Sequence, residues 1–260
     1  MKVLILAGGF GTRISEESHL RPKPMIEIGE MPILWHIMKY YSSYGYNDFI
    51  ILAGYKQYVI KEYFANYFLH NSDVTFDLSN NQMEVHHNMN EPWRVTIVDT
   101  GLNTMTGGRI RRVRKYIGDE RFLLTYGDGV TDADISDEIA FHERSGSWLT
   151  VLGTNPRNKF GVLKINDETN RVESFFEKND GDGNWINAGY FVCEPRIFDY
   201  IKDGDATVFE RAPMERLALD GKMSIYKHTG FWKPMDTLRD NSELNEMWNS
   251  GNPPWKCWSD

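Results

Sequence analysis

The chain has 260 residues, of which 41% are hydrophobic and 25% are charged, and its net charge is −8. This ordinary globular composition excludes a disordered chain, and the acidic balance argues against bulk nucleic-acid binding. The apolar runs are too short for a membrane helix, the first residues leave no room for a signal peptide, and two cysteines (Cys193 and Cys257) cannot build a disulfide scaffold. We therefore expect a protein of the reducing cytosol that binds neither membrane nor nucleic acid.

Buried strands alternate with helices in the first half of the chain. Residues 2–7 form a continuous apolar run that ends at Gly8-Gly9, which is typical of a strand covered on both faces. The alternation predicts an α/β fold with a Rossmann-like, mostly parallel sheet flanked by helices. Further strands are predicted at 48–53, 94–98 and 121–126, and helices from Pro32 to about Gly45, from about Gln57 and after Gly108.

The second half of the chain is rich in strands. We find no internal repeat and no linker, so a single domain is the simplest organisation. An aromatic tail around Trp255 and Trp258 is expected to pack on the body or on a neighbouring subunit, and is the one residue-level hint of an oligomer. Strands are predicted at 148–154, 160–166, 171–177 and 186–192, and helices near 195–202, 211–220 and 237–249.

The segment from Leu6 to Arg13 (Leu-Ala-Gly-Gly-Phe-Gly-Thr-Arg), followed by Lys23, is suited to holding phosphate. A glycine-rich turn after a strand lets backbone N–H groups approach phosphate oxygens, and the two side chains add positive charge. A tight turn with two surface cations is the alternative. A dinucleotide fingerprint is a weak match, because Ile14 stands where the third glycine belongs.

Several charged residues allow both a functional and an ordinary reading. Asp128, between two glycines, is a metal ligand or a turn former, and Asp236 is a metal ligand or the N-cap of the last helix. Glu177-Lys178 is a substrate contact or an exposed ion pair. The basic run from Arg109 to Lys115 has helical apolar spacing, so most of it forms a solvated face, whereas Arg109 is placed at a helix start to meet a nucleotide.

The motifs, in their order and spacing, resemble those of the sugar-1-phosphate nucleotidylyltransferases, also called nucleotide-sugar pyrophosphorylases. The resemblance covers almost the whole chain and is strongest to the branch that joins CTP to α-D-glucose 1-phosphate. The motifs are Gly8-Gly-Phe-Gly-Thr-Arg13, Pro22-Lys-Pro-Met25, Thr104-Met-Thr-Gly-Gly-Arg109, Tyr126-Gly-Asp-Gly129, Phe160-Gly-Val162, Phe176-Glu-Lys178, Asn187-Ala-Gly189 and Trp232-Lys-Pro-Met-Asp236.

The resemblance implies a nucleotide-diphospho-sugar transferase fold and a Mg²⁺-dependent attack of the sugar phosphate on the α-phosphate of CTP. It implies a nucleotide-binding part at about 1–130, a sugar-phosphate-binding part at about 131–240 and a C-terminal helix and tail at about 237–260. It also implies a cytoplasmic homo-oligomer, a hexamer or trimer, that serves dideoxysugar synthesis for surface polysaccharide such as O-antigen. A sister enzyme using UTP or dTTP, or an inactive binding or regulatory homologue, is the rival.

Residue by residue, the resemblance implies that Arg13 and Lys23 are catalytic, and that Asp128 and Asp236 bind the metal. It implies that Gly161, Glu177, Lys178 and Asn187 bind the sugar phosphate. The nucleotide-binding residues that it implies are Leu6, Ala7, Gly8, Gly9, Phe10, Gly11, Thr12, Arg13, Lys23, Thr104, Arg109 and Gly127.

Overall fold

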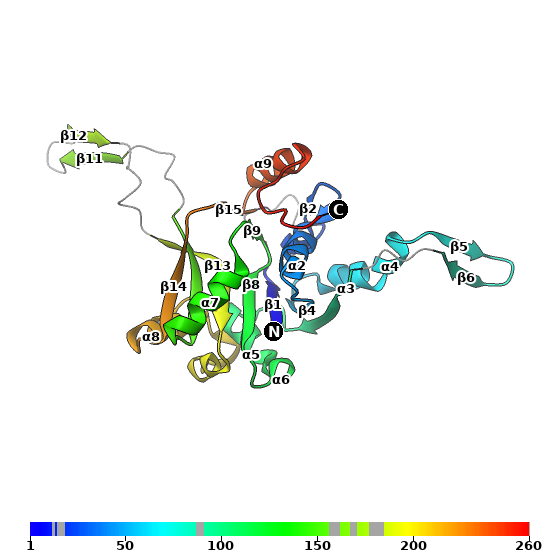
Figure 1. The fold of residues 1–260 in the computed structure, drawn as a ribbon, viewed down its shortest axis with the longest axis horizontal. Helices are drawn as coiled ribbons and strands as arrows, with labels where there is room; N and C mark the ends of the chain where they lie inside the picture. The colour runs from blue at the N-terminus through cyan, green and yellow to red at the C-terminus, as the bar shows by residue number, and fades with distance from the viewer. Residues whose placement is uncertain are drawn as a thin grey trace.

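A seven-stranded sheet runs through the middle of the molecule (Figure 1). The structure is a computed structural model and describes residues 1–11, 14, 19–86, 91–155, 162–166, 171–176 and 185–259. Within the sheet β13 runs antiparallel to both of its neighbours and the remaining pairs are parallel, so the predicted mostly parallel sheet is confirmed. In spatial order the strands are β14 (Met223–His228), β10 (Leu149–Thr154), β13 (Ile186–Cys193), β8 (Phe122–Tyr126), β1 (Lys2–Ala7), β4 (Asp48–Ala53) and β7 (Arg94–Asp99).

Helices connect these strands, and among the described residues four small two-stranded ladders lie outside the main sheet. The α-helices are α2 (Ile33–Ser43), α3 (Gln57–Ala65), α4 (Tyr67–His70), α5 (Thr106–Arg112), α6 (Arg114–Ile117), α7 (Ile135–Ser145), α8 (Ala212–Leu219) and α9 (Leu238–Asn249). The 3-10 helices are η2 (Lys23–Met25), η3 (Pro195–Tyr200) and η4 (Gly204–Ala206). The ladders pair β2 (Glu27–Ile28) with β3 (Met31–Pro32), β5 (Val74–Asp77) with β6 (Gln82–Val85), β9 (Gly129–Thr131) with β15 (Trp232–Pro234), and β11 (Val162–Asn166) with β12 (Arg171–Phe176).

The side chains of β1 alternate between two hydrophobic cores, one on each face of the sheet. Val3 and Ile5 pack into the core that α2, α7 and α9 cover, whereas Leu4 packs into the core that α5, α6 and α8 cover. All three side chains are fully buried. Because successive residues of a strand point to opposite faces, a strand covered on both sides needs the uninterrupted apolar run that the sequence contains.

The structure corrects two of the predicted helices. The segment near 195–202 is the 3-10 helix η3 and not a longer α-helix. Helix α5 begins at Thr106, so Gly107 and Gly108 lie inside its first turn instead of preceding it. The physical reason is close packing: both glycine N–H groups donate to Thr207 O, and a Cβ at either position would collide with the chain at 205–207.

An arm made of α3, α4 and the β5–β6 hairpin projects from the body (Figure 1). Its hairpin exposes large apolar side chains, with Leu78 90% and Phe76 59% accessible. The aromatic tail behaves differently, because Trp255 is fully buried and stacks on Phe231 and Trp248 of its own chain. In the parts of the chain that the structure describes, no helix combines the length and the apolar character needed to span a membrane.

Candidate active site

A cavity of about 630 Å³ opens where β1 and β8 end. In open α/β sheets this carboxyl edge is where ligands bind. The cavity therefore gathers the glycine-rich loop, the Lys23 turn and both predicted metal carboxylates in one place. The predicted site residues that line it are Leu6, Ala7, Gly8, Gly9, Phe10, Gly11, Lys23, Thr104, Arg109, Gly127, Asp128 and Asp236.

Lys23 stands between the two predicted metal ligands. Its ammonium Nζ lies 2.6 Å from Asp128 Oδ2 and 2.7 Å from Asp236 Oδ1. Burial by itself would lower the pKa of Lys23, but the two carboxylates outweigh burial and raise this pKa above its ordinary value of 10.5. Lys23 is therefore a firmly charged group in the wall of the cavity.

The turn that carries Lys23 is set by the prolines beside it. The 3-10 helix η2 starts directly after Pro22, and Met25 N donates to Pro22 O at 2.8 Å. Pro24 and Met25 are buried, so they anchor the turn in the core. Proline restricts the backbone torsion φ, and the ammonium is consequently presented with little loss of chain entropy.

A short antiparallel ladder brings Asp128 and Asp236 together from distant parts of the chain. Strand β9 pairs with β15 so that Gly129 lies opposite Pro234, and Met235 N continues the pairing by donating to Asp128 O at 2.8 Å. Helix α9 is capped by the side chain of Thr237 in a capping box. The alternative reading of Asp236 as the cap is therefore wrong, and its carboxylate meets Lys23 instead.

Arg109 braces the loops that surround the cavity. Its side chain is buried, and its guanidinium donates to the carbonyl oxygens of Gly8 (2.9 Å), Gly101 (2.7 Å) and Leu102 (3.1 Å) and to Thr100 Oγ1 (2.7 Å). A Cβ at position 8 would collide with this guanidinium, which explains why glycine is required there. Arg109 thus ties the glycine-rich loop to the 100–102 loop while also lining the cavity.

Two cavity residues, Tyr126 and Glu210, were not singled out from the sequence. Glu210 accepts hydrogen bonds from Tyr126 Oη and from Thr106 Oγ1, each at 2.6 Å, and Tyr126 Oη accepts from Asn187 Nδ2 at 3.1 Å. The predicted sugar residue Asn187 is thereby linked to the cavity wall. Tyr126 can be recognised by its place in the Tyr-Gly-Asp-Gly motif, whereas Glu210, in a Phe-Glu-Arg stretch, carries no such signal.

The other predicted site residues, Thr12, Arg13, Gly161, Glu177 and Lys178, lie outside the residues that the structure describes.

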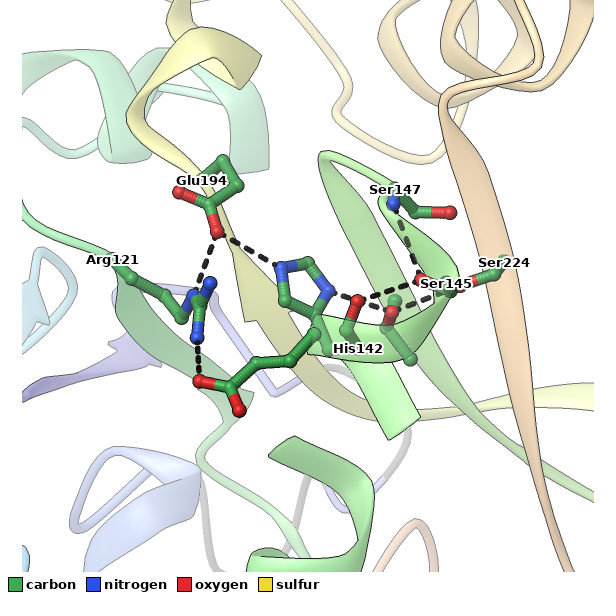
Figure 2. Close-up of polar contacts among 8 residues, drawn as sticks. Arg121, His142, Ser145, Ser147, Glu194 and Ser224 are labelled. Carbon is green, nitrogen blue, oxygen red and sulfur yellow. Dashed lines mark hydrogen bonds and ion pairs between the residues drawn. The ribbon is translucent and has the colours of Figure 1, made fainter. Parts of the chain in front are cut away.

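A second polar cluster lies at the opposite end of β8, away from the cavity (Figure 2). Glu194 accepts from Arg121 Nε at 2.7 Å and lies 3.2 Å from His142 Nε2, while His142 Nδ1 meets Thr150 Oγ1 at 2.7 Å. Burial lowers the pKa of His142, so the ring is neutral at pH 7. Both ring nitrogens are occupied within the protein, which gives this histidine a structural role.

The described residues hold no group of three or more His, Cys, Asp or Glu side chains arranged to bind a metal. Cys193 is buried, and burial raises the pKa of its thiol well above its ordinary value. Such a thiol is a poor nucleophile. Cys257 is exposed, with its Sγ 3.0 Å from Ser43 Oγ.

Known proteins of similar sequence are enzymes that transfer nucleotides. The family model "Nucleotidyl transferase" matches residues 2–233. The glucose-1-phosphate cytidylyltransferase of Salmonella typhi is 56% identical to this chain. The probable glucose-1-phosphate cytidylyltransferase of Bacillus subtilis is 45% identical. Each alignment covers 99% of this chain and 100% of the relative.

Among solved structures, the UDP-glucose pyrophosphorylase of Acinetobacter baumanii superposes with a TM-score of 0.70 over 98% of this chain and 95% of its own, at 16% identity. This likeness shows the nucleotide-diphospho-sugar transferase fold. The chain belongs to the nucleotidyl transferase family and, within it, to the glucose-1-phosphate cytidylyltransferases.

Proposed function

We propose that this protein makes CDP-glucose and pyrophosphate from CTP and α-D-glucose 1-phosphate. The observation that carries the proposal is the convergence of Lys23, Asp128 and Asp236 beside the glycine-rich loop in one cavity. This cavity combines backbone donors for phosphate, a fixed cation and a pair of carboxylates. Its relatives of 56% and 45% identity carry the name of this activity.

In the proposed reaction a phosphate oxygen of glucose 1-phosphate attacks the α-phosphorus of CTP in line. The bond from the α-phosphorus to the bridging oxygen breaks, and pyrophosphate leaves with that electron pair. No covalent enzyme intermediate is needed, because positioning and charge neutralisation suffice for such transfers. We assign Lys23 to the charge that develops on the α-phosphate and Arg13 to the triphosphate.

The donor set at the cavity fits Mg²⁺. Asp128 and Asp236 offer hard carboxylate oxygens, which are ligands that Mg²⁺ prefers. Both lie within hydrogen-bond distance of the Lys23 ammonium, so the position between them is suited to a cation. We assign these two residues to the metal. Bound Mg²⁺ supplies charge neutralisation of the phosphates.

We propose a single domain in which nucleotide binding is assigned to about 1–130 and sugar-phosphate binding to about 131–240. Asn187, with Gly161, Glu177 and Lys178, is assigned to the sugar phosphate. The remaining cavity residues from the glycine-rich loop, with Thr104 and Gly127, are assigned to the nucleotide. We place the enzyme in the cytoplasm, where its product serves dideoxysugar synthesis for surface polysaccharide.

Pyrophosphate release tests the proposed function. The protein is incubated with glucose 1-phosphate, Mg²⁺ and either CTP, UTP, dTTP or GTP. We expect a clear preference for CTP, with kcat/KM well above that for UTP, and equal values for CTP and UTP would contradict the choice of CTP as substrate. Activity restricted to UTP or dTTP would make it a sister enzyme instead, and absence of activity with all four, despite calorimetric binding of CTP, would make it an inactive binding protein.

A further inference from the structure

Glu210 is the central acceptor of a hydrogen-bond chain along one wall of the cavity. A carboxylate can only accept, so the hydroxyls of Tyr126 and Thr106 must both donate to it. The oxygen of Thr106 in turn accepts from Phe209 N at 2.9 Å, and that of Tyr126 accepts from Asn187 Nδ2. Glu210 therefore fixes the direction in which both hydroxyls donate, and each hydroxyl oxygen accepts from a neighbouring N–H group.

The two ends of this hydrogen-bond chain lie in the parts of the site assigned to the two different substrates. Thr106 is the first residue of α5, two residues after Thr104, in the segment assigned to the nucleotide. Asn187 lies in β13 and is assigned to the sugar phosphate. The side chain of Asn187 is held twice, because its Oδ1 accepts from Gly189 N at 2.8 Å while its Nδ2 donates to Tyr126.

The backbone at Glu210 is itself held in place. The neighbouring Phe209 is fully buried in the core under α5 and α8, with its ring 5.9 Å from that of Phe191. Phe209 N also donates to Thr106 Oγ1. The carboxylate therefore projects into the cavity wall from a rigid support, which is what a residue that orients others requires.

We propose that Glu210 is a positioning residue for the sugar phosphate. Through Tyr126 it fixes the plane of the Asn187 amide, so that the second N–H of this amide is aimed at the sugar. Through Thr106 it ties that alignment to the start of α5. The inference rests on the proposed function and assigns Glu210 no contact with the reacting atoms.

Replacement of Glu210 by Gln tests this role, because the amide keeps the size but must present N–H to one of the two hydroxyls. Either Tyr126 loses its acceptor, or Thr106 does and the side chain at position 210 loses its second anchor. In both cases we expect the alignment of Asn187 to weaken. We expect KM for glucose 1-phosphate to rise about tenfold, as for loss of one hydrogen bond to a charged group, with KM for CTP changed less than about twofold. Initial rates of CDP-glucose formation at varied concentrations of each substrate give both constants.

Tyr126→Phe is the second variant, since it removes the same link and keeps the ring that packs against Gly189 and Phe191. We expect the same rise in KM for glucose 1-phosphate, and a double variant with Glu210→Gln no worse than either single one. Tyr200→Phe is the matched control. Tyr200 Oη donates to the Asp220 carboxylate at 2.6 Å, the same type and length of bond, but outside this cavity.

Three outcomes would overturn the inference. The first is an active wild-type enzyme whose two cavity variants leave KM for glucose 1-phosphate unchanged. The second is an equal rise in KM for CTP and for glucose 1-phosphate, which indicates general loosening. The third is additivity in the double variant. A wild-type protein that forms no CDP-glucose would instead overturn the proposed function, and the inference with it.

Discussion

Lys23 carries the positive charge that allows two carboxylates to face an anionic substrate. Side by side and without a cation, the carboxylates of Asp128 and Asp236 would repel each other. In the structure the ammonium lies within 2.7 Å of both. In the proposed mechanism this ammonium would meet a phosphate if a metal ion took its place beside the carboxylates.

Lys23→Met removes this charge but keeps much of the side chain that packs in the wall. Because an electrostatic donor aimed at the transition state is lost, we expect kcat for pyrophosphate release to fall by about 10² or more. Lys39→Met is the matched control, since Lys39 pairs with Glu91 at 2.8 Å on another part of the molecule. Near-normal turnover of the Lys23 variant, at unchanged melting temperature, would remove Lys23 from the reaction.

His36 makes the stability of the protein depend on pH. It is fully buried, with Nε2 2.9 Å from Ile28 O and Nδ1 3.4 Å from Trp255 Nε1. The indole can only donate, so Nδ1 is an unprotonated acceptor and the ring is neutral. Burial lowers the pKa of His36 to about 4 from its ordinary 6.5. The unfolded chain therefore binds a proton that the folded protein rejects.

This contribution of His36 to the free energy of unfolding is complete above pH 6.5 and is lost as the pH falls towards 4, by about 3 kcal/mol. Urea unfolding at pH 7.5, 6 and 5 measures it. His36→Gln, which cannot titrate, is expected to flatten the pH dependence, whereas substitution of the exposed His70 by Gln is expected to leave it unchanged. Equal slopes in wild type and His36→Gln would contradict this account.

The pairing of β9 with β15 brings Asp128 and Asp236 together, and we expect the two carboxylates to act as one unit. Asp128→Asn and Asp236→Asn should each remove most Mg²⁺-dependent activity, and the double variant should be little worse than either. Asp48→Asn is the control, because Asp48 has the same 29% exposure as Asp128 but pairs with Arg94. Activity of the wild type in excess chelator, or full activity of either single variant, would refute the metal assignment.

The sequence predicts the elements whose signal is local. Residues 2–7 and 48–53 are uninterrupted apolar runs, which predict strands that are covered on both faces. The 33–43 helix is predicted from apolar side chains at helical spacing. The three-residue pairing of β9 with β15 has no such signal, because tertiary packing and not propensity holds so short a ladder.

The same reason separates the site residues that are predicted from those that are not. Lys23 stands out through its prolines and its motif, and Asp128 through its place after a buried strand. Glu210 is defined only by contacts with residues about a hundred positions earlier in the chain, at Tyr126 and Thr106. The sequence around Glu210, just before α8, contains no pattern that indicates these partners.

The projecting hairpin β5–β6 (Figure 1) is the surface on which we expect the homo-oligomer implied by the family resemblance to form. Phe76 and Leu78 are largely exposed, and apolar side chains gathered on a hairpin are typical of a buried interface. Phe76→Asp with Leu78→Asp is therefore expected to lower the mass measured by light scattering. Leu219→Asp, at a residue 86% exposed on α8, is the control that should leave the mass unchanged. A wild-type monomer would contradict the expectation.

The C-terminal segment completes the cavity. We therefore expect the enzyme to become active only after this segment has been synthesised and has docked. The glycine-rich loop is made first, yet the cavity also needs Glu210 and Asp236, and the aromatic tail must still seal Trp255 over His36. A nascent chain that lacks its last quarter therefore presents the glycine-rich loop without Glu210 and Asp236, and its cavity is incomplete. Because a ligand stabilises only the state that binds it, we expect saturating nucleotide to protect full-length chains whose C-terminal segment has docked, and not chains that lack this segment.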